Sequence, residues 1–188
     1  MRRSIYVGPW RIDVTIRDGV ESPVAAAGLA RAMARAAEAA RAPSPASIGL
    51  ILADDPELAS LNAAHLGKHG PTDVLSFPLL PPAAFPPHQG GPARSGSRAA
   101  PPAGPATVFR LPPGRRLHLG DVVISVGRAI EQASAGRGGQ TGDLRWAPAD
   151  ELRLLAMHGT LHLCGWDHAE PGEETAMRAL EARLLAHE

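Results

Sequence analysis

Residues 156–168, with the sequence AMHGTLHLCGWDH, constrain the fold more than any other part of the chain. The histidines follow the spacing His-x3-His-x5-His, and Gly165 stands between the second and the third. Residues four apart on a helix project from the same face, so His158 and His162 lie one turn apart. Gly165 is placed to end that helix in a left-handed turn, which can bring His168 back as a third partner. The chain must therefore form a helix, a sharp turn and a returning segment here.

These three imidazoles are suited to hold one metal ion. Histidine nitrogens bind zinc at about 2.0–2.1 Å, and His158, His162 and His168 supply three of them. Three protein ligands leave a fourth position for water, which is the mark of a catalytic rather than a structural zinc site. We therefore predict one Zn²⁺ ion at this cluster. Cys164 lies inside the segment but on another helix face, and we expect it to be a buried small hydrophobic residue.

The same spacing, H-x-x-x-H-x-x-G-x-x-H, occurs in the metzincin metallopeptidases. Those enzymes carry a glutamate directly after the first histidine, where it acts as the general base. This chain has Gly159 at that position, and glycine can transfer no proton. The sequence favours a zincin-like metal-site helix and disfavours peptidase chemistry by that route.

Strand and helix patterns alternate along the rest of the chain. Ile12, Val14 and Ile16 alternate with polar residues, which predicts a half-buried strand. Asp54 followed by Pro56 and Glu57 is a typical helix start. The interleaving predicts an α/β or α+β sandwich around a small sheet. We expect the α+β form, with four strands and about five helices, in a single domain over residues 1–188. Strands are expected at residues 10–17, 47–53, 74–77 and 122–126, and helices at 23–41, 55–66, 128–135, 148–164 and from 171 onward.

Composition narrows the class of protein. Basic and acidic residues balance at 19 each, so no overall positive field indicates a nucleic-acid partner, although a local patch can still serve one. The single cysteine excludes a disulfide framework. No run approaches the roughly 18 to 20 apolar residues of a membrane span, and the N-terminus lacks the apolar stretch of a signal peptide. We expect a cytoplasmic protein with no membrane partner.

Residues 79–117 are dense in Pro, Gly, Ala and Ser. Such a composition does not sustain core-facing periodicity, so we expect a disordered or mobile surface insertion. Deletion of residues 82–112 should then leave the fold intact. The histidines outside the metal motif lack partners in sequence and are expected in solvent: His65, His69, His88, His118 and His187.

Three ordered blocks of the chain resemble those of the YbeY endoribonucleases, a family of bacterial rRNA maturation factors. Residues 158–168 fit its pattern H-G-x-L-H-L-x-G-[YFW]-D-H at every fixed position. Residues 71–78 read PTDVLSFP, and residues 119–124 read LGDVVI, which fits L-G-D-[IV]-x-I. The resemblance covers most of the chain from about Ile12 to Leu185, apart from the insertion.

This resemblance implies a zinc-dependent, single-strand-specific endoribonuclease that acts in small-subunit ribosomal RNA 3′-end maturation and ribosome quality control. It implies single-stranded or ribosomal RNA and the small ribosomal subunit as partners. It also implies a mixed sheet with helices packed around it, and His158, His162 and His168 as the zinc ligands.

The chain departs from the family at one position. The family typically has an arginine five residues before the proline of PTDVLSFP, where this chain has Leu66. A guanidinium could grip a phosphate or stabilise a phosphorane, and leucine can do neither. Lys68, His65 or an arginine such as Arg145 could substitute, or cleavage could be weakened.

Several residues are candidates for catalytic or positioning roles beside the metal. Asp73, Asp121 and Asp167 could transfer protons or orient a ligand imidazole through its second nitrogen. Asp167 has an equal alternative as a turn residue. Ser76 should face opposite to its strand neighbours, where it lines the site or is merely a tolerated small residue. Trp166 is either a stacking surface for RNA bases or, as we favour, a core anchor.

Two other functions stay open at this point. The first is a non-nucleolytic ribosome-assembly factor that keeps zinc for structure or RNA docking, which Leu66 would favour. The second is another metal hydrolase, including a peptidase whose base comes from elsewhere. Whether water or the RNA 2′-hydroxyl attacks the phosphorus is likewise open.

Overall fold

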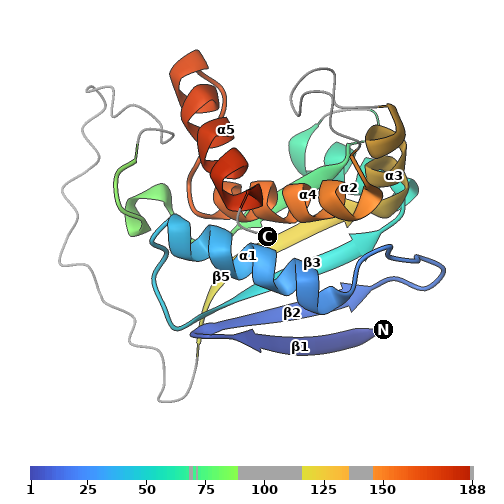
Figure 1. The fold of residues 1–188 in the computed structure, drawn as a ribbon, viewed down its shortest axis with the longest axis horizontal. Helices are drawn as coiled ribbons and strands as arrows, with labels where there is room; N and C mark the ends of the chain where they lie inside the picture. Colours follow the sequence, from blue (N-terminus) through green and yellow to red (C-terminus); the bar gives the residue numbers. More distant parts are fainter. Residues whose placement is uncertain (68–69, 71, 89–115, 136–145, 187–188) are drawn as a thin grey trace.

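The computed structural model describes residues 1–67, 70, 72–88, 116–135 and 146–186. Within these residues the chain forms a five-stranded sheet and five α-helices, an α+β fold (Figure 1). The strands are β1 (Arg2–Val7), β2 (Trp10–Ile16), β3 (Ala46–Ala53), β4 (Val74–Pro78) and β5 (Leu117–Ser125). The helices are α1 (Ala26–Ala39), α2 (Asp55–Leu66), α3 (Val126–Ala135), α4 (Pro148–Leu163) and α5 (Pro171–Leu185).

The sheet is mixed, with the strand order β1-β2-β3-β5-β4. β2, β3 and β5 are parallel, while β1 and β4 pair antiparallel at the two edges. The sequence predicted four strands, and the prediction missed β1. This edge strand is mostly exposed, and Tyr6 is 63% exposed. Its sequence RRSIYV therefore lacks the strong apolar alternation that burial of one face imposes.

Most of the core lies between the sheet and the helices α1 and α4, and α5 packs on these two helices on the same side of the sheet (Figure 1). Ile12 and Val14 of β2 are fully buried there, together with Leu50 of β3. A smaller cluster on the opposite face joins Leu58 of α2 to Val123 of β5. Because side chains alternate along a strand, neighbouring residues of β5 serve different faces of the sheet.

The helix boundaries follow the signals in the sequence. The Asp54 carboxylate accepts a hydrogen bond from the Glu57 backbone N–H at 2.9 Å and caps α2, as predicted. Pro148 and Pro171 each begin a helix, where a missing N–H costs nothing. α4 ends at Leu163, and Gly165 adopts φ +81°, so the predicted left-handed turn is confirmed.

The first part of the predicted insertion, residues 79–88, is described by the structure. Residues 82–84 form a short 3-10 helix, η1 (Pro82–Ala84), and Phe85 behind it is only 6% exposed within the main core. Deletion of residues 82–112 would therefore remove a buried side chain, and its effect on the fold stays a prediction. Residues 89–115, which carry most of the Pro- and Gly-rich sequence, lie outside the described residues.

β5 begins at Leu117, earlier than the predicted start at residue 122. The pairing with β3 shifts register between Ser47 and Gly49, so an irregularity interrupts the period of two that marks a strand. Gly120 adopts φ +140° at this point, where a Cβ would lie 2.2 Å from the Phe77 carbonyl oxygen.

Among the described helices, none combines the length and apolarity needed to cross a membrane.

Candidate metal centre

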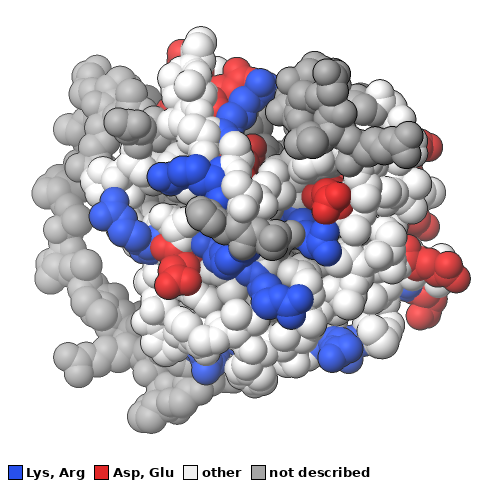
Figure 2. All heavy atoms as spheres, in the orientation of Figure 1, with Lys and Arg blue, Asp and Glu red and all other residues white. Residues whose placement is uncertain are grey.

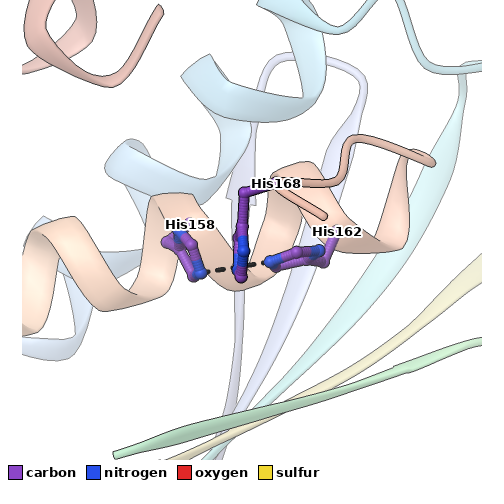
Figure 3. Close-up of side chains that lie close together, drawn as sticks. All are labelled: His158, His162 and His168. Carbon is purple, nitrogen blue, oxygen red and sulfur yellow. Dashed lines mark hydrogen bonds between the residues drawn. The ribbon is translucent and has the colours of Figure 1, made fainter. Parts of the chain in front are cut away.

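The structure brings the three predicted histidines together. His158 and His162 project from α4, and His168 reaches them from the segment that connects α4 to α5 (Figure 3). The Nε2 atoms of His158 and His162 lie 3.1 Å apart. One nitrogen from each of the three rings falls within 4.8 Å of the others. No other group of His, Cys, Asp or Glu in the described part of the chain converges in this way.

The end of α4 delivers His168 to this position. The backbone N–H of Gly165 donates to the His162 carbonyl at 3.0 Å, and that of Trp166 donates to the Leu161 carbonyl at 3.1 Å. These bonds occupy the last carbonyls of the helix and reverse the chain. The Asp167 carboxylate then accepts the backbone N–H of His168 at 2.8 Å.

The donor set fits a zinc ion. Two nitrogens that each lie about 2.0–2.1 Å from one ion, at a tetrahedral angle, are about 3.4 Å apart. The 3.1 Å separation of His158 and His162 needs little change to reach that value. His168 is exposed, so the cluster opens to solvent on one side. The cluster could therefore hold a metal ion that is still accessible to a substrate.

The environment of His162 keeps a ring nitrogen free for a metal. Burial lowers the pKa of His162 to about 4, and the neighbouring His158 and His168 contribute to this lowering. The imidazole is therefore neutral at physiological pH. Only the neutral ring offers a lone pair to a metal ion.

Glu181 is the carboxylate that contacts the cluster, and sequence reasoning missed it. Its Oε1 atom lies 2.7 Å from Nδ1 of His158, and the side chains are 13% and 24% exposed respectively. This contact places the ring proton on Nδ1 and leaves Nε2 to face His162. A signal was present in the sequence, because Glu181 stands four residues after the buried Met177, on the inward side of α5.

Gly159 shows why this helix carries no glutamate after its first histidine. A Cβ at this position would lie 2.5 Å from Cγ1 of Val122 and 3.1 Å from Oγ of Ser76. The Ser76 hydroxyl donates to the Gly159 carbonyl at 3.0 Å. The helix thus lies directly on β4 and β5 at this residue, and a larger side chain would push it away from the sheet.

A family model described as Endoribonuclease YbeY matches residues 16–187. This chain belongs to the YbeY endoribonuclease family. It is 42% identical over 142 residues to "Endoribonuclease YbeY" of Salinispora tropica, covering 75% of this chain and 73% of that protein.

Other relatives carry the same name. The protein of Cyanothece sp. is 37% identical over 139 residues, and that of Mycobacterium tuberculosis is 38% identical over 142 residues. The alignments cover 73% and 74% of this chain but 63% of each of these relatives. The solution structure of TM1509 from Thermotoga maritima matches with a TM-score of 0.45 and 16% identity, covering 93% of this chain and 90% of that one.

The three aspartates of the YbeY-like blocks lie in different places. Asp167 stands beside His168. The Asp73 carboxylate accepts hydrogen bonds from the Val74 backbone at 2.8 Å and from Gln132 at 3.0 Å, so it joins β4 to α3. Asp121 lies on the sheet face opposite α4, because its neighbour Val122 is the residue that contacts Gly159.

Asp121 forms a second polar cluster with His118, a residue predicted to lie in solvent. Nε2 of His118 lies 3.3 Å from the Asp121 carboxylate, and Nδ1 lies 3.0 Å from Oγ of Ser47. The hydrogen bond that His118 donates to the Asp121 carboxylate raises the pKa of His118. Gly49 provides the space, because a Cβ there would lie 1.8 Å from Oδ1 of Asp121.

The remaining candidates are placed as follows. Leu66, the residue predicted to depart from the family pattern, is 56% exposed at the end of α2. His65 is exposed, as expected, and its ring meets that of Phe77 edge-on at 5.2 Å. Cys164 is buried, as predicted, and burial raises its pKa to about 12. The other candidates, Lys68 and Arg145, and the histidines His69 and His187 lie outside the described residues.

Proposed function

We propose that this protein is a zinc-dependent, single-strand-specific endoribonuclease that acts in small-subunit ribosomal RNA 3′-end maturation and ribosome quality control. One observation carries the proposal: His158, His162 and His168 converge with their nitrogens within 4.8 Å, in a chain of the YbeY family. The relatives are named endoribonucleases. We further propose that residues 1–188 act as one domain in the cytoplasm, with the small ribosomal subunit as partner.

The three histidines would hold one Zn²⁺. Bound there, zinc would supply Lewis-acid stabilisation of a phosphate oxygen and would lower the pKa of a water molecule. His158 and His162 are fixed by the helix, and the low pKa of His162 keeps its lone pair available. Glu181 holds the proton of His158 on the nitrogen that faces away from the cluster.

Other residues would divide between proton transfer and positioning. Asp167 lies next to His168 on the exposed side, and we retain it as the proton-transfer candidate. Ser76 would act through the helix, because its hydroxyl binds the carbonyl of Gly159 between the two helical ligands. Asp73 and Asp121 would support the sheet around the site, since their carboxylates are held by Gln132 and His118.

An RNA partner agrees with the distribution of charge. Figure 2 shows several Arg side chains on the face that carries α1, α4 and α5, with some Asp and Glu side chains among them. Arg31 and Arg41 near α1 and Arg183 on α5 are exposed. Despite the balanced total charge, these Arg side chains are exposed and could contact RNA phosphates.

Cleavage assays would test the proposal. Labelled single-stranded RNA, duplex RNA and casein are incubated with the full-length protein, with and without a chelator. We expect chelator-sensitive cleavage of single-stranded RNA alone, restored by zinc. Absence of RNA cleavage by the zinc-loaded protein would contradict the proposal, and cleavage of casein would identify another metal hydrolase.

A second function has one observation in its favour. The exposed Leu66 stands where we expect the family to have an arginine for catalysis or RNA contact, which favours a ribosome-assembly factor that binds RNA without cutting it. Leu66→Arg distinguishes the two. If the chain is a nuclease weakened by this substitution, the variant cleaves faster than the wild type. If neither protein cleaves but both bind the small subunit, the assembly factor is correct.

A further inference from the structure

A segment remote in sequence packs against the turn that leads to His168. A Cβ at Gly165 would contact the Cα and Cβ of Pro82 at 3.6 Å and Cδ2 of Phe85 at 3.9 Å. Phe85 is 6% exposed and belongs to the same core cluster as Leu163. Residues 82–85, which the sequence assigned to a mobile insertion, therefore lie directly on the end of α4.

The next contact in this segment is a ring stack. The rings of His88 and Trp166 are parallel, with centroids 4.1 Å apart and an interplanar angle of 6°. Burial lowers the pKa of His88, so the stacked ring is neutral near neutral pH. Trp166 Nε1 and His88 Nδ1 are buried and have no hydrogen-bond partner among the described residues. Packing and ring stacking, rather than hydrogen bonds of these two atoms, hold the contact together.

Trp166 is the last anchored residue before the third histidine. The residues from Asp167 to Gly172 are exposed, whereas Trp166 packs against the main core. His158 and His162 need no such support, because helical geometry already sets their separation. The position of His168 therefore depends on how firmly the chain is held just before it.

We infer that Phe85 and His88 form a brace that positions His168 for metal binding. The inference depends on the proposed function in one respect, because it requires His168 to be a zinc ligand. Both residues act through Trp166 and the turn at Gly165, and in the structure neither belongs to the histidine cluster, so they are positioning residues. The stack also occupies one face of the Trp166 ring, so that face is closed to an RNA base.

The test compares His88→Ala, which removes the stack, with His88→Phe, which retains a flat ring. His65→Ala is the matched control, because it removes a histidine ring contact with Phe77 elsewhere in the molecule. His88 is used rather than Phe85 because it is only half-buried, so its variants should fold. Zinc affinity is measured by competition with a chromophoric chelator, and the dissociation rate by transfer to excess chelator.

We expect His88→Ala to weaken zinc binding by about 10-fold, as outer-shell changes do, mainly through faster dissociation. His88→Phe should restore both values, and His65→Ala should match the wild type. Equal affinity and dissociation rate in His88→Ala and the wild type would overturn the brace while leaving the proposed function intact.

A second readout needs no metal. Amide hydrogen exchange at residues 164–170 of the metal-free protein should quicken in His88→Ala and return to the wild-type rate in His88→Phe. If the wild type bound no zinc, the proposed function would fail, and this exchange would still decide whether the brace exists. Unchanged exchange in His88→Ala would refute it.

Discussion

Two histidine sites lie on opposite faces of the same sheet and have opposite electrostatics. On the α4 face, burial and two neighbouring imidazoles lower the pKa of His162 to about 4. On the other face, the hydrogen bond that His118 donates to the Asp121 carboxylate raises the pKa of His118. A metal ion competes with protons for the imidazole lone pair, so the first environment favours metal binding and the second favours a charged imidazolium.

Carboxylates are present at both histidine sites. Their presence alone therefore does not explain why one site favours a metal ion and the other a charged imidazolium. Glu181 contacts Nδ1 of His158, so Nε2 of His158 faces Nε2 of His162 inside the cluster. At His118 both nitrogens are engaged, by Ser47 and by Asp121. The comparison teaches that a metal site is recognised by ring nitrogens that converge on one point. The number of histidines or acids nearby does not identify it.

The largest expected effect comes from removing one helical ligand. His162→Ala should lose stoichiometric zinc, because two nitrogens bind the ion far more weakly than three. Metal content after gel filtration, measured by mass spectrometry, checks this. His118→Asn is the matched control from the opposite face and should retain one zinc per chain. Full zinc content in His162→Ala would contradict the assignment of His162 as a zinc ligand.

The next largest effect is expected from removing the Glu181 carboxylate, which contacts Nδ1 of His158. Glu181→Ala should lower zinc affinity about 10- to 100-fold, and Glu181→Gln less, because the amide oxygen can still accept the Nδ1 proton. Chelator competition measures both. Glu174→Gln on the same helix, which breaks only the exposed pair with Arg178, serves as the control. Equal affinity in all three variants would mean that His158 needs no partner to bind zinc.

A moderate effect is expected where α4 touches the sheet. Gly159→Ala should lower the free energy of unfolding by about 1–3 kcal/mol, because the added methyl meets Val122 at 2.5 Å. Gly172→Ala in α5 meets no atom within 4 Å and should be neutral or stabilising. Denaturant unfolding compares the two. A stable Gly159→Ala protein would show that close packing does not explain the missing glutamate.

The smallest effect is a change in pH dependence. The pKa of His118 is raised in the folded state, so its contribution to stability is present below the unfolded pKa of about 6.5 and is lost as pH rises through the folded value. Asp121→Asn should therefore destabilise the protein more at pH 6 than at pH 8. Urea unfolding of the variant and the wild type across this range measures it. A destabilisation that grows as pH rises would contradict a raised pKa at His118.

Local signals in the sequence predicted most of the elements. The cap at Asp54, the prolines at residues 148 and 171 and the alternation in β2 depend on near neighbours, and the structure confirms each of them. β1 was missed because an exposed edge strand is under little constraint from burial. The ordered residues 82–88 were missed because their partners, Gly165 and Trp166, lie far along the chain.

By itself, then, the sequence determined the three converging histidines, since helical spacing and a glycine turn fix them within one short segment, residues 158–168. It also determined membership in the YbeY family, through three short blocks. Only the tertiary structure decided which carboxylate meets His158, which face Asp121 occupies and what supports Trp166. Those contacts join strands and helices distant in sequence, and packing of the whole core, rather than any local preference, brings such residues together.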